Sequence, residues 1–232
     1  MDMLRLNLGA GNGSDNLLFQ SISKNALLLG SFALITTGLV ALTSNATRER
    51  IILAHHKALE KALLEIVSKD SHNNNLLKDY IKVNSPLLAL KTPEDAFLAR
   101  QDGTPVAAII PTLAPEGYGG SISLIVGIQY DGTITGVRIV PPHNETPGLG
   151  DKIEIKKSDW LLNFNGKSLA NTKDKAWKVK KDGGEFDQLT GATITPRAVV
   201  KAVHNTLKYF DYNKEQLFSH SPSDSETLHL EQ

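Results

Sequence analysis

The stretch SISLIVGIQYDGTITGVRIV, residues 121–140, decides the fold. Its first half, Ser121–Tyr130, is rich in β-branched residues and is typical of a strand. Asp131-Gly132 is a strong hairpin turn signal, and Thr133–Val140 returns with the alternating pattern of a second strand. The stretch therefore predicts an antiparallel pair and, with it, a mostly antiparallel sheet.

The segments on either side of this hairpin complete one domain. Thr104–Pro111 is apolar and strand-like, and a helix is predicted from about Pro196 to Tyr212. The apolar stripe of that helix is Val199, Val203, Leu207 and Phe210. We therefore predict an α+β fold in which residues 91–212 form one domain with a mostly antiparallel sheet and flanking helices. Residues 213–232 are rich in serine and acidic residues, and we expect a disordered tail.

The N-terminal part contains one long uncharged stretch. After a tail over residues 1–24, Asn25–Thr43 has no charged side chain and is long enough to span a hydrocarbon core of about 30 Å as a helix. A cleaved signal peptide is the alternative, and Ser44-Asn45-Ala46 would serve as its cleavage site. The apolar stretch is longer than the core of about 7–15 residues of such a peptide. We therefore favour a retained transmembrane helix.

A connecting helical segment follows over residues 44–90. Apolar residues recur at helical spacing from Arg48 to Lys69, and the polar cluster at residues 71–75 ends the pattern. The positive charges near the membrane lie mostly after the apolar stretch, which favours a cytoplasmic C-terminal domain. This indication is weak because large domains are translocated largely regardless of charge.

The composition excludes several classes of function. Lysine plus arginine and aspartate plus glutamate number 25 each, so the chain has no bulk electrostatic attraction to nucleic acid, and no nucleic-acid partner is expected. It has no cysteine, which removes disulfides, thiol catalysis and cysteine-ligated zinc or iron–sulfur clusters. If the protein handles electrons, it needs an organic cofactor, a haem or a metal site with histidine or carboxylate ligands. Of these three, we expect no metal site.

The segment DQLTGATITP, residues 187–196, has the features of a phosphate site. Thr195 followed by Pro196 is a good helix start, and the helix dipole with its free N–H groups favours a phosphate nearby. Gly191 and Ala192 allow close approach of a ligand to the backbone, and the Thr193 hydroxyl is adjacent. By these features alone, an ordinary capped turn remains the simpler interpretation.

Two glycine-containing loops precede this segment. HNETPGLG, residues 143–150, would let a flat ring lie against the backbone, and Glu145 and His143 are possible acid–base groups. GYGG, residues 117–120, is either a close-approach loop with an aromatic residue beside a ligand or a plain turn. Neither loop matches a phosphate-binding or dinucleotide-binding fingerprint. Each loop alone is compatible with an ordinary connection.

The order of these segments resembles a known family. The segments follow one another as GYGG, an apolar strand, a DG turn, a second strand, HNETPGLG and finally DQLTGAT before a helix. This order resembles that of the FMN-binding domain of the G subunit in the Rnf-type electron transport complex. The C subunit of the sodium-pumping NADH:quinone oxidoreductase is a close relative. In that family, Asp-x-x-(Ser/Thr)-Gly-Ala-Thr is the motif at which a flavin transferase takes FMN from FAD and joins its phosphate to the last threonine.

The resemblance implies a site residue by residue. The motif is intact as Asp187, Thr190, Gly191, Ala192 and Thr193, so FMN would be bound covalently through its phosphate to Thr193. The isoalloxazine would lie against the loop that contains Glu145, Thr146, Gly148, Leu149 and Gly150, and Tyr118 would be a bulky contact. The resemblance assigns no catalytic residue.

The resemblance also implies a function and a location. The chain would relay electrons through FMN between neighbouring membrane subunits of a complex that couples electron flow, such as that between reduced ferredoxin and NAD, to ion movement. It would have no turnover of its own. The domain would lie on the periplasmic side of the bacterial inner membrane, opposite to the charge count, and we follow the family because the charge bias is small.

Two rival functions remain at this point. One is a cofactor-free anchored assembly or binding subunit of a membrane complex, which would carry no flavin. The other is an anchored enzyme that uses His143 or Glu145 as its base and acts on a soluble substrate.

Overall fold

The described part of the chain starts with one long helix. The computed structural model describes residues 12–219 and divides the chain into two compact units, with the boundary between Ala54 and His55. Helix α1, Asn12–Ile66, replaces the two separate helical segments that the sequence predicted, and residues 12–24 belong to it instead of to a tail. Within it, Gln20–Ile51 has a mean hydropathy of 2.0 and is long and apolar enough to cross a membrane.

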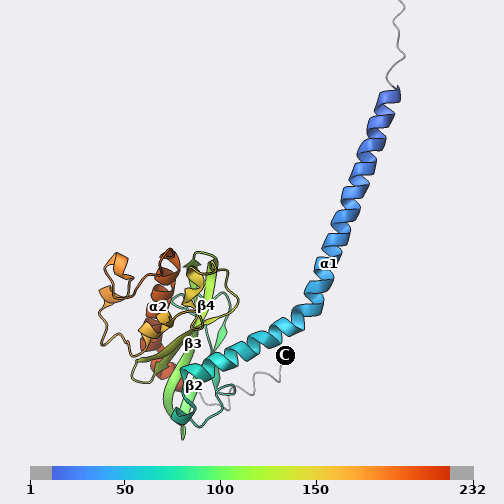
Figure 1. The fold of residues 1–232 in the computed structure, drawn as a ribbon. Coiled ribbons are helices and arrows are strands. Elements are labelled where there is room, and N and C mark those ends of the chain that lie inside the picture. The colour runs from blue at the N-terminus through green and yellow to red at the C-terminus, as the bar shows by residue number, and fades with distance from the viewer. Residues whose placement is uncertain (1–11, 220–232) are drawn as a thin grey trace, which may run out of the picture. The chain divides into compact units, whose positions relative to one another are not determined.

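The second unit is built on a five-stranded antiparallel sheet in sequential order (Figure 1). The strands are β1 (Tyr80–Val83), β2 (Glu94–Gln101), β3 (Thr104–Gly117), β4 (Gly120–Gln129) and β5 (Ile134–Val140). The predicted hairpin is confirmed as β4 and β5, with Ser123 opposite Val140. Strand β3 is longer than predicted because it pairs with both β2 and β4, and Gly117 opposite Gly120 closes a tight β3–β4 turn.

The first strand was missed by the sequence analysis. Residues 44–90 were expected to be helical, yet α1 ends at Ile66, a 3₁₀ turn (η1) follows at Lys69–Ser71, and β1 starts at Tyr80. Strand β1 has only four residues, and all four pair with β2. Such a strand is defined by long-range pairing, because four residues are too few to show a reliable local period.

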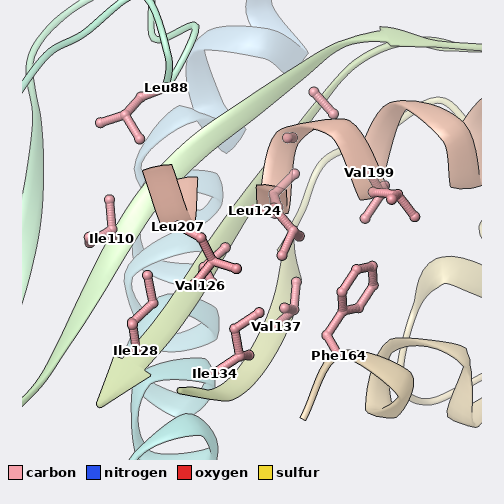
Figure 2. Packing of buried hydrophobic residues seen from close by; sticks show 14 of the residues in the cluster. Leu88, Ile110, Leu124, Val126, Ile128, Ile134, Val137, Phe164, Val199 and Leu207 are labelled. Carbon is pink, nitrogen blue, oxygen red and sulfur yellow. The ribbon is translucent and has the colours of Figure 1, made fainter. Parts of the chain in front are cut away.

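One face of the sheet is covered by helix α2, Ile194–Ser219 (Figure 1). Figure 2 shows Val199 and Leu207 of α2 in one buried cluster with Leu124 and Val126 of β4. The helix runs beyond the predicted end at Tyr212, so the predicted tail from residue 213 is wrong up to Ser219. The reason is the burial of Leu217 and Phe218, which are only 2% and 8% exposed. The rest of that predicted tail lies outside the described residues.

The other face receives the last turns of α1. Leu63 and Ile66 pack with Phe97, Ile109 and Ile125 of the sheet. Gly127 and Gly136 lie opposite each other in β4 and β5, and a Cβ on Gly127 would meet the Ile66 side chain at 2.0 Å. Gly127 thus makes room for the helix. Because both faces are covered, β4 is almost continuously apolar.

Between β5 and α2, short 3₁₀ turns carry an aromatic cluster. The turns are η2 (Gly150–Ile153), η3 (Asp159–Phe164), η4 (Asp174–Ala176) and η5 (Lys180–Asp182). Phe164 stacks on Phe186 at 4.6 Å between ring centroids, and Trp160 meets Phe164 edge-on. The Trp160 indole N–H donates to the Asp187 carbonyl at 2.7 Å, so this cluster fixes the start of the DQLTGAT segment.

Candidate functional site

Three loops distant in sequence meet at the start of α2. They are the GYGG turn (residues 117–120), the GLG loop (residues 143–150) and the TGAT turn (residues 190–193). The Gly119 amide donates to Glu145 at 3.0 Å, which joins the first two. A Cβ on Gly191 would lie 3.0 Å from the Leu149 side chain, which places the GLG loop against the TGAT turn. The structure therefore brings together the segments that the sequence analysis singled out.

The TGAT turn leads directly into the helix. The Ala192 amide donates to the Leu189 carbonyl at 2.9 Å, and Gly191 has φ +79°, a conformation that favours glycine. The Arg197 amide donates to the Thr193 carbonyl, so the hydrogen-bond ladder of α2 starts at Thr193. Thr193 is partly exposed, and within residues 12–219 no hydrogen bond engages its hydroxyl. A partly exposed hydroxyl thus lies at the N-terminus of a 26-residue helix.

Thr195 has a different role from the one predicted. The sequence analysis made it the N-cap, but α2 already begins at Ile194. Thr195 is fully buried, and its hydroxyl donates a short hydrogen bond to the Glu145 carboxylate. The physical reason is that a buried acceptor on another loop lies within reach of the hydroxyl. A local cap pattern cannot reveal such a partner.

The GLG loop is a compact turn with an exposed tip. The amides of Leu149 and Asp151 both donate to the Thr146 carbonyl, at 3.1 and 3.3 Å. Gly148 has φ +78°, and Leu149 at the tip is 41% exposed. Tyr118, on the neighbouring GYGG turn, is 69% exposed. Apolar side chains therefore remain accessible beside the TGAT turn.

Comparison with known proteins places this geometry in a family. The FMN-binding domain model matches residues 117–208, which contain all three loops, and the RnfG N-terminal region model matches residues 13–66. A Pseudomonas aeruginosa protein, named as the G subunit of an ion-translocating oxidoreductase complex, is 50% identical over 201 residues, 86% of this chain and 94% of its own length. Two proteins of the same name are also similar. The one from Pseudoalteromonas atlantica is 49% identical over 87% of this chain and 94% of its own length. The one from Vibrio cholerae is 47% identical over 86% of this chain and 95% of its own length.

The chain belongs to this family. Its relatives in this family are named as G subunits of an ion-translocating oxidoreductase complex, and this chain has one N-terminal apolar helix and an FMN-binding domain in an α+β fold. The resemblance inferred from the motif order is confirmed. The FMN-binding domain match covers β4, β5, the 3₁₀ turns η2–η5 and most of α2, and the three loops within it are the candidate flavin site.

Space at the GYGG turn of the FMN-binding domain is limited by backbone atoms. A Cβ on Gly119 would lie 2.0 Å from the Asn144 carbonyl oxygen, so the GYGG turn and the GLG loop touch main chain to main chain. We expect Gly119→Ala to lower the free energy of unfolding by about 1–3 kcal/mol, because backbone must move. Gly136→Ala is the matched control, since its nearest new contact is an ordinary 3.5 Å. Urea denaturation measures both, and equal effects would contradict the close approach.

The two candidate bases in the family's GLG loop are engaged in hydrogen bonds. His143 Nδ1 accepts from the Glu145 amide, which places its proton on Nε2, and Nε2 lies 3.0 Å from Glu154. Both Glu145 carboxylate oxygens accept hydrogen bonds inside the protein. Both side chains are thus engaged in hydrogen bonds within the protein.

A cluster of charged side chains lies immediately after the GLG loop in the sequence. Lys157 bonds Asp151 at 2.9 Å and Glu154 at 2.7 Å. The Lys157 hydrogen bond lowers the pKa of Asp151. Burial alone would raise the pKa of Glu154, but hydrogen bonds from Lys157 and His143 outweigh it and lower that pKa. The cluster therefore fixes the chain immediately after Gly150.

This cluster predicts a pH-dependent stability. Carboxylates with a lowered pKa stabilise the folded state above their unfolded pKa of about 4, and this contribution is lost as the pH falls through the folded pKa. We expect Lys157→Met to lower the melting temperature at pH 7 and to lower it less at pH 3. Thermal unfolding at both values checks this, with Lys156→Met as the neighbouring control. A difference that grows on acidification would refute the assignment.

The motif aspartate points to a lysine at the surface. The Asp187 carboxylate pairs with Lys180 at 2.7 Å, and both side chains are largely exposed. Thr190 is exposed at the turn. These two residues are thus accessible on the surface, whereas the site predictions omitted buried Thr195 and partly buried Gly119, which both hydrogen-bond to Glu145. The Thr195-Pro196 pair was noticed in the sequence but was assigned only a capping role.

Proposed function

We propose that Thr193 carries FMN covalently through a phosphoester and that this subunit relays electrons within its complex. The observation that carries the proposal is the Thr193 hydroxyl, partly exposed and without a hydrogen-bond partner among the described residues, at the start of α2. N–H groups in the first turn of a helix have no partner within the helix, and the helix dipole favours a negative group there. A phosphate ester on Thr193 suits both features.

The residues around Thr193 fit the rest of the cofactor. Gly191 and Ala192 present little side chain, and the GLG loop with Thr146, Gly148, Leu149 and Gly150 lies next to the TGAT turn. Tyr118 and Leu149 offer exposed apolar surface for a flat ring. Bound FMN supplies reversible electron uptake and release, and the protein supplies attachment, orientation and the surrounding charges. No residue here needs a catalytic role, and we expect no independent turnover.

The proposed location gives a reason for the covalent bond. The family region at residues 13–66 includes the apolar stretch and the helix after it, which supports a retained single-pass anchor. We place the domain on the periplasmic side of the bacterial inner membrane, as the family resemblance implies. No flavin pool replaces a lost cofactor there, and a tether removes dissociation. The proposed partners are the other membrane subunits of the ferredoxin/NAD oxidoreductase-type complex and, during maturation, a flavin transferase.

Intact mass of the full chain tests the proposal. The chain is produced with and without the flavin transferase, and we expect a gain of one FMN less one water only when the transferase is present. The modified chain should also fluoresce as flavin on a denaturing gel. An unchanged mass with active transferase would overturn covalent attachment. Only if the native chain also lacks flavin absorbance would the cofactor-free assembly subunit be the better description.

A further inference from the structure

Glu145 is the one acidic residue in the three loops, and it is buried. It is 5% exposed, and each of its carboxylate oxygens accepts one hydrogen bond from a different segment. Oε1 accepts from the Gly119 amide on the GYGG turn at 3.0 Å. Oε2 accepts from the Thr195 hydroxyl in the first turn of α2. One side chain of the GLG loop therefore joins the other two parts of the site.

The surrounding glycines show how tightly this carboxylate is enclosed. A Cβ on Gly150 would lie 2.5 Å from Oε2, and a Cβ on Gly117 would lie 2.9 Å from Oε1. Both distances are shorter than a normal contact, so a side chain at either position would displace the carboxylate. A Cβ on Gly117 would also lie 2.4 Å from the Gly120 carbonyl oxygen. Gly117 and Gly150 thus leave room for Glu145.

The partners of Glu145 are neutral. Among residues 12–219, no lysine, arginine or histidine forms an ion pair with it. A buried carboxylate without a cation must be compensated by hydrogen bonds and dipoles. Thr195 is the second residue of α2, so the carboxylate lies at the positive end of that helix dipole. The same interaction holds the helix start, and Thr193 immediately before it, in a fixed place relative to both loops.

We propose that Glu145 is a positioning residue that fixes Thr193 and the TGAT turn against the GYGG turn and the GLG loop, and does not serve as a contact of the flavin ring. That the positioned residue, Thr193, carries FMN rests on the proposed function. The junction of the three loops at Glu145 does not depend on it. Loss of the carboxylate would free the Gly119 amide and the Thr195 hydroxyl together. The start of α2 and the GYGG turn would then open more often.

Hydrogen exchange of the full, detergent-solubilised chain tests the junction without any flavin. In Glu145→Ala we expect exchange to speed up about tenfold or more in peptides covering residues 117–120 and 189–197, because two hydrogen bonds are lost. Glu145→Gln should restore protection, since its carbonyl accepts from Gly119 and its amide donates to the Thr195 oxygen. Thr195→Val should open the α2 peptide, and Thr195→Ser should not.

The control is Glu116→Ala, which removes an exposed carboxylate paired with Lys201 close to the same turn. Tryptophan fluorescence verifies that each variant is folded. If Glu145→Ala does not fold, Thr195→Val still tests the junction. Equal exchange in Glu145→Ala and Glu116→Ala would overturn the proposal, as would failure of Glu145→Gln to restore protection.

Flavin incorporation then separates this proposal from the proposed function. With the transferase present, we expect Glu145→Ala to gain FMN at least about tenfold more slowly than the wild type, and Glu145→Gln at a rate close to it. If the wild type gains no FMN, the proposed function fails while the exchange result still decides the junction. If the wild type gains FMN and Glu145→Ala gains it equally fast, the positioning role is refuted.

Discussion

Thr193→Ala is expected to abolish covalent flavin incorporation completely and, with it, electron transfer through this subunit. The ester needs a hydroxyl at this position, and alanine has none. The variant should fold, because Thr193 contributes its carbonyl to the first hydrogen bond of α2 and the hydroxyl bonds none of the described residues. The intact mass should therefore remain that of the unmodified chain even with abundant transferase and FAD.

Two matched variants make this result interpretable. Thr193→Ser keeps a hydroxyl and should still gain FMN. Thr133→Ala removes another partly exposed threonine, in the β4–β5 turn far along the chain from the TGAT turn, and should leave incorporation at the wild-type level. FMN retained by Thr193→Ala would place the attachment on a different residue. Loss in Thr133→Ala as well would indicate a general folding defect.

The hairpin and the membrane-length helix were predictable from local pattern. Residues 121–140 combine β-branched runs with a DG turn, and the structure has β4 and β5 there. The apolar stretch after Asn25 was equally clear and lies within α1. The end of α2 was not predictable, because Leu217 and Phe218 extend the helix through contacts with distant residues such as Tyr130. Short strand β1 depends on β2 in the same way.

The site was predictable as a set of segments but not as a network. Motif order alone identified the GYGG turn, the GLG loop and the TGAT turn, and the FMN-binding domain match covers all of them. The bond from Thr195 to Glu145 spans 50 positions in the sequence, so no local rule reveals it. Sequence patterns identify the segments that form the site, whereas the buried side chains that accept hydrogen bonds between them are identified only from the structure.

The second large effect is expected at a buried ion pair that contacts the C-terminal end of α2. Arg100 Nε lies 3.0 Å from Asp79 Oδ2, with side chains only 9% and 3% exposed. Asn74 donates to the same oxygen, and the guanidinium also reaches the Phe218 carbonyl at the end of α2. Asp79→Asn is expected to lower the free energy of unfolding by about 3–5 kcal/mol, because it replaces the buried carboxylate that pairs with the Arg100 guanidinium by a neutral amide.

Urea denaturation followed by tryptophan fluorescence measures this cost in the domain alone, since both tryptophans, Trp160 and Trp177, lie in it. Lys82→Met is the matched control: it breaks the exposed Lys82–Asp95 pair and should cost less than about 1 kcal/mol. The double variant Asp79→Leu/Arg100→Met should be less destabilised than Asp79→Asn, because it buries no lone charge. If Asp79→Asn costs no more than Lys82→Met, the pair does not hold the end of α2 to the sheet, and the burial of Leu217 and Phe218 alone must explain why the helix extends to Ser219.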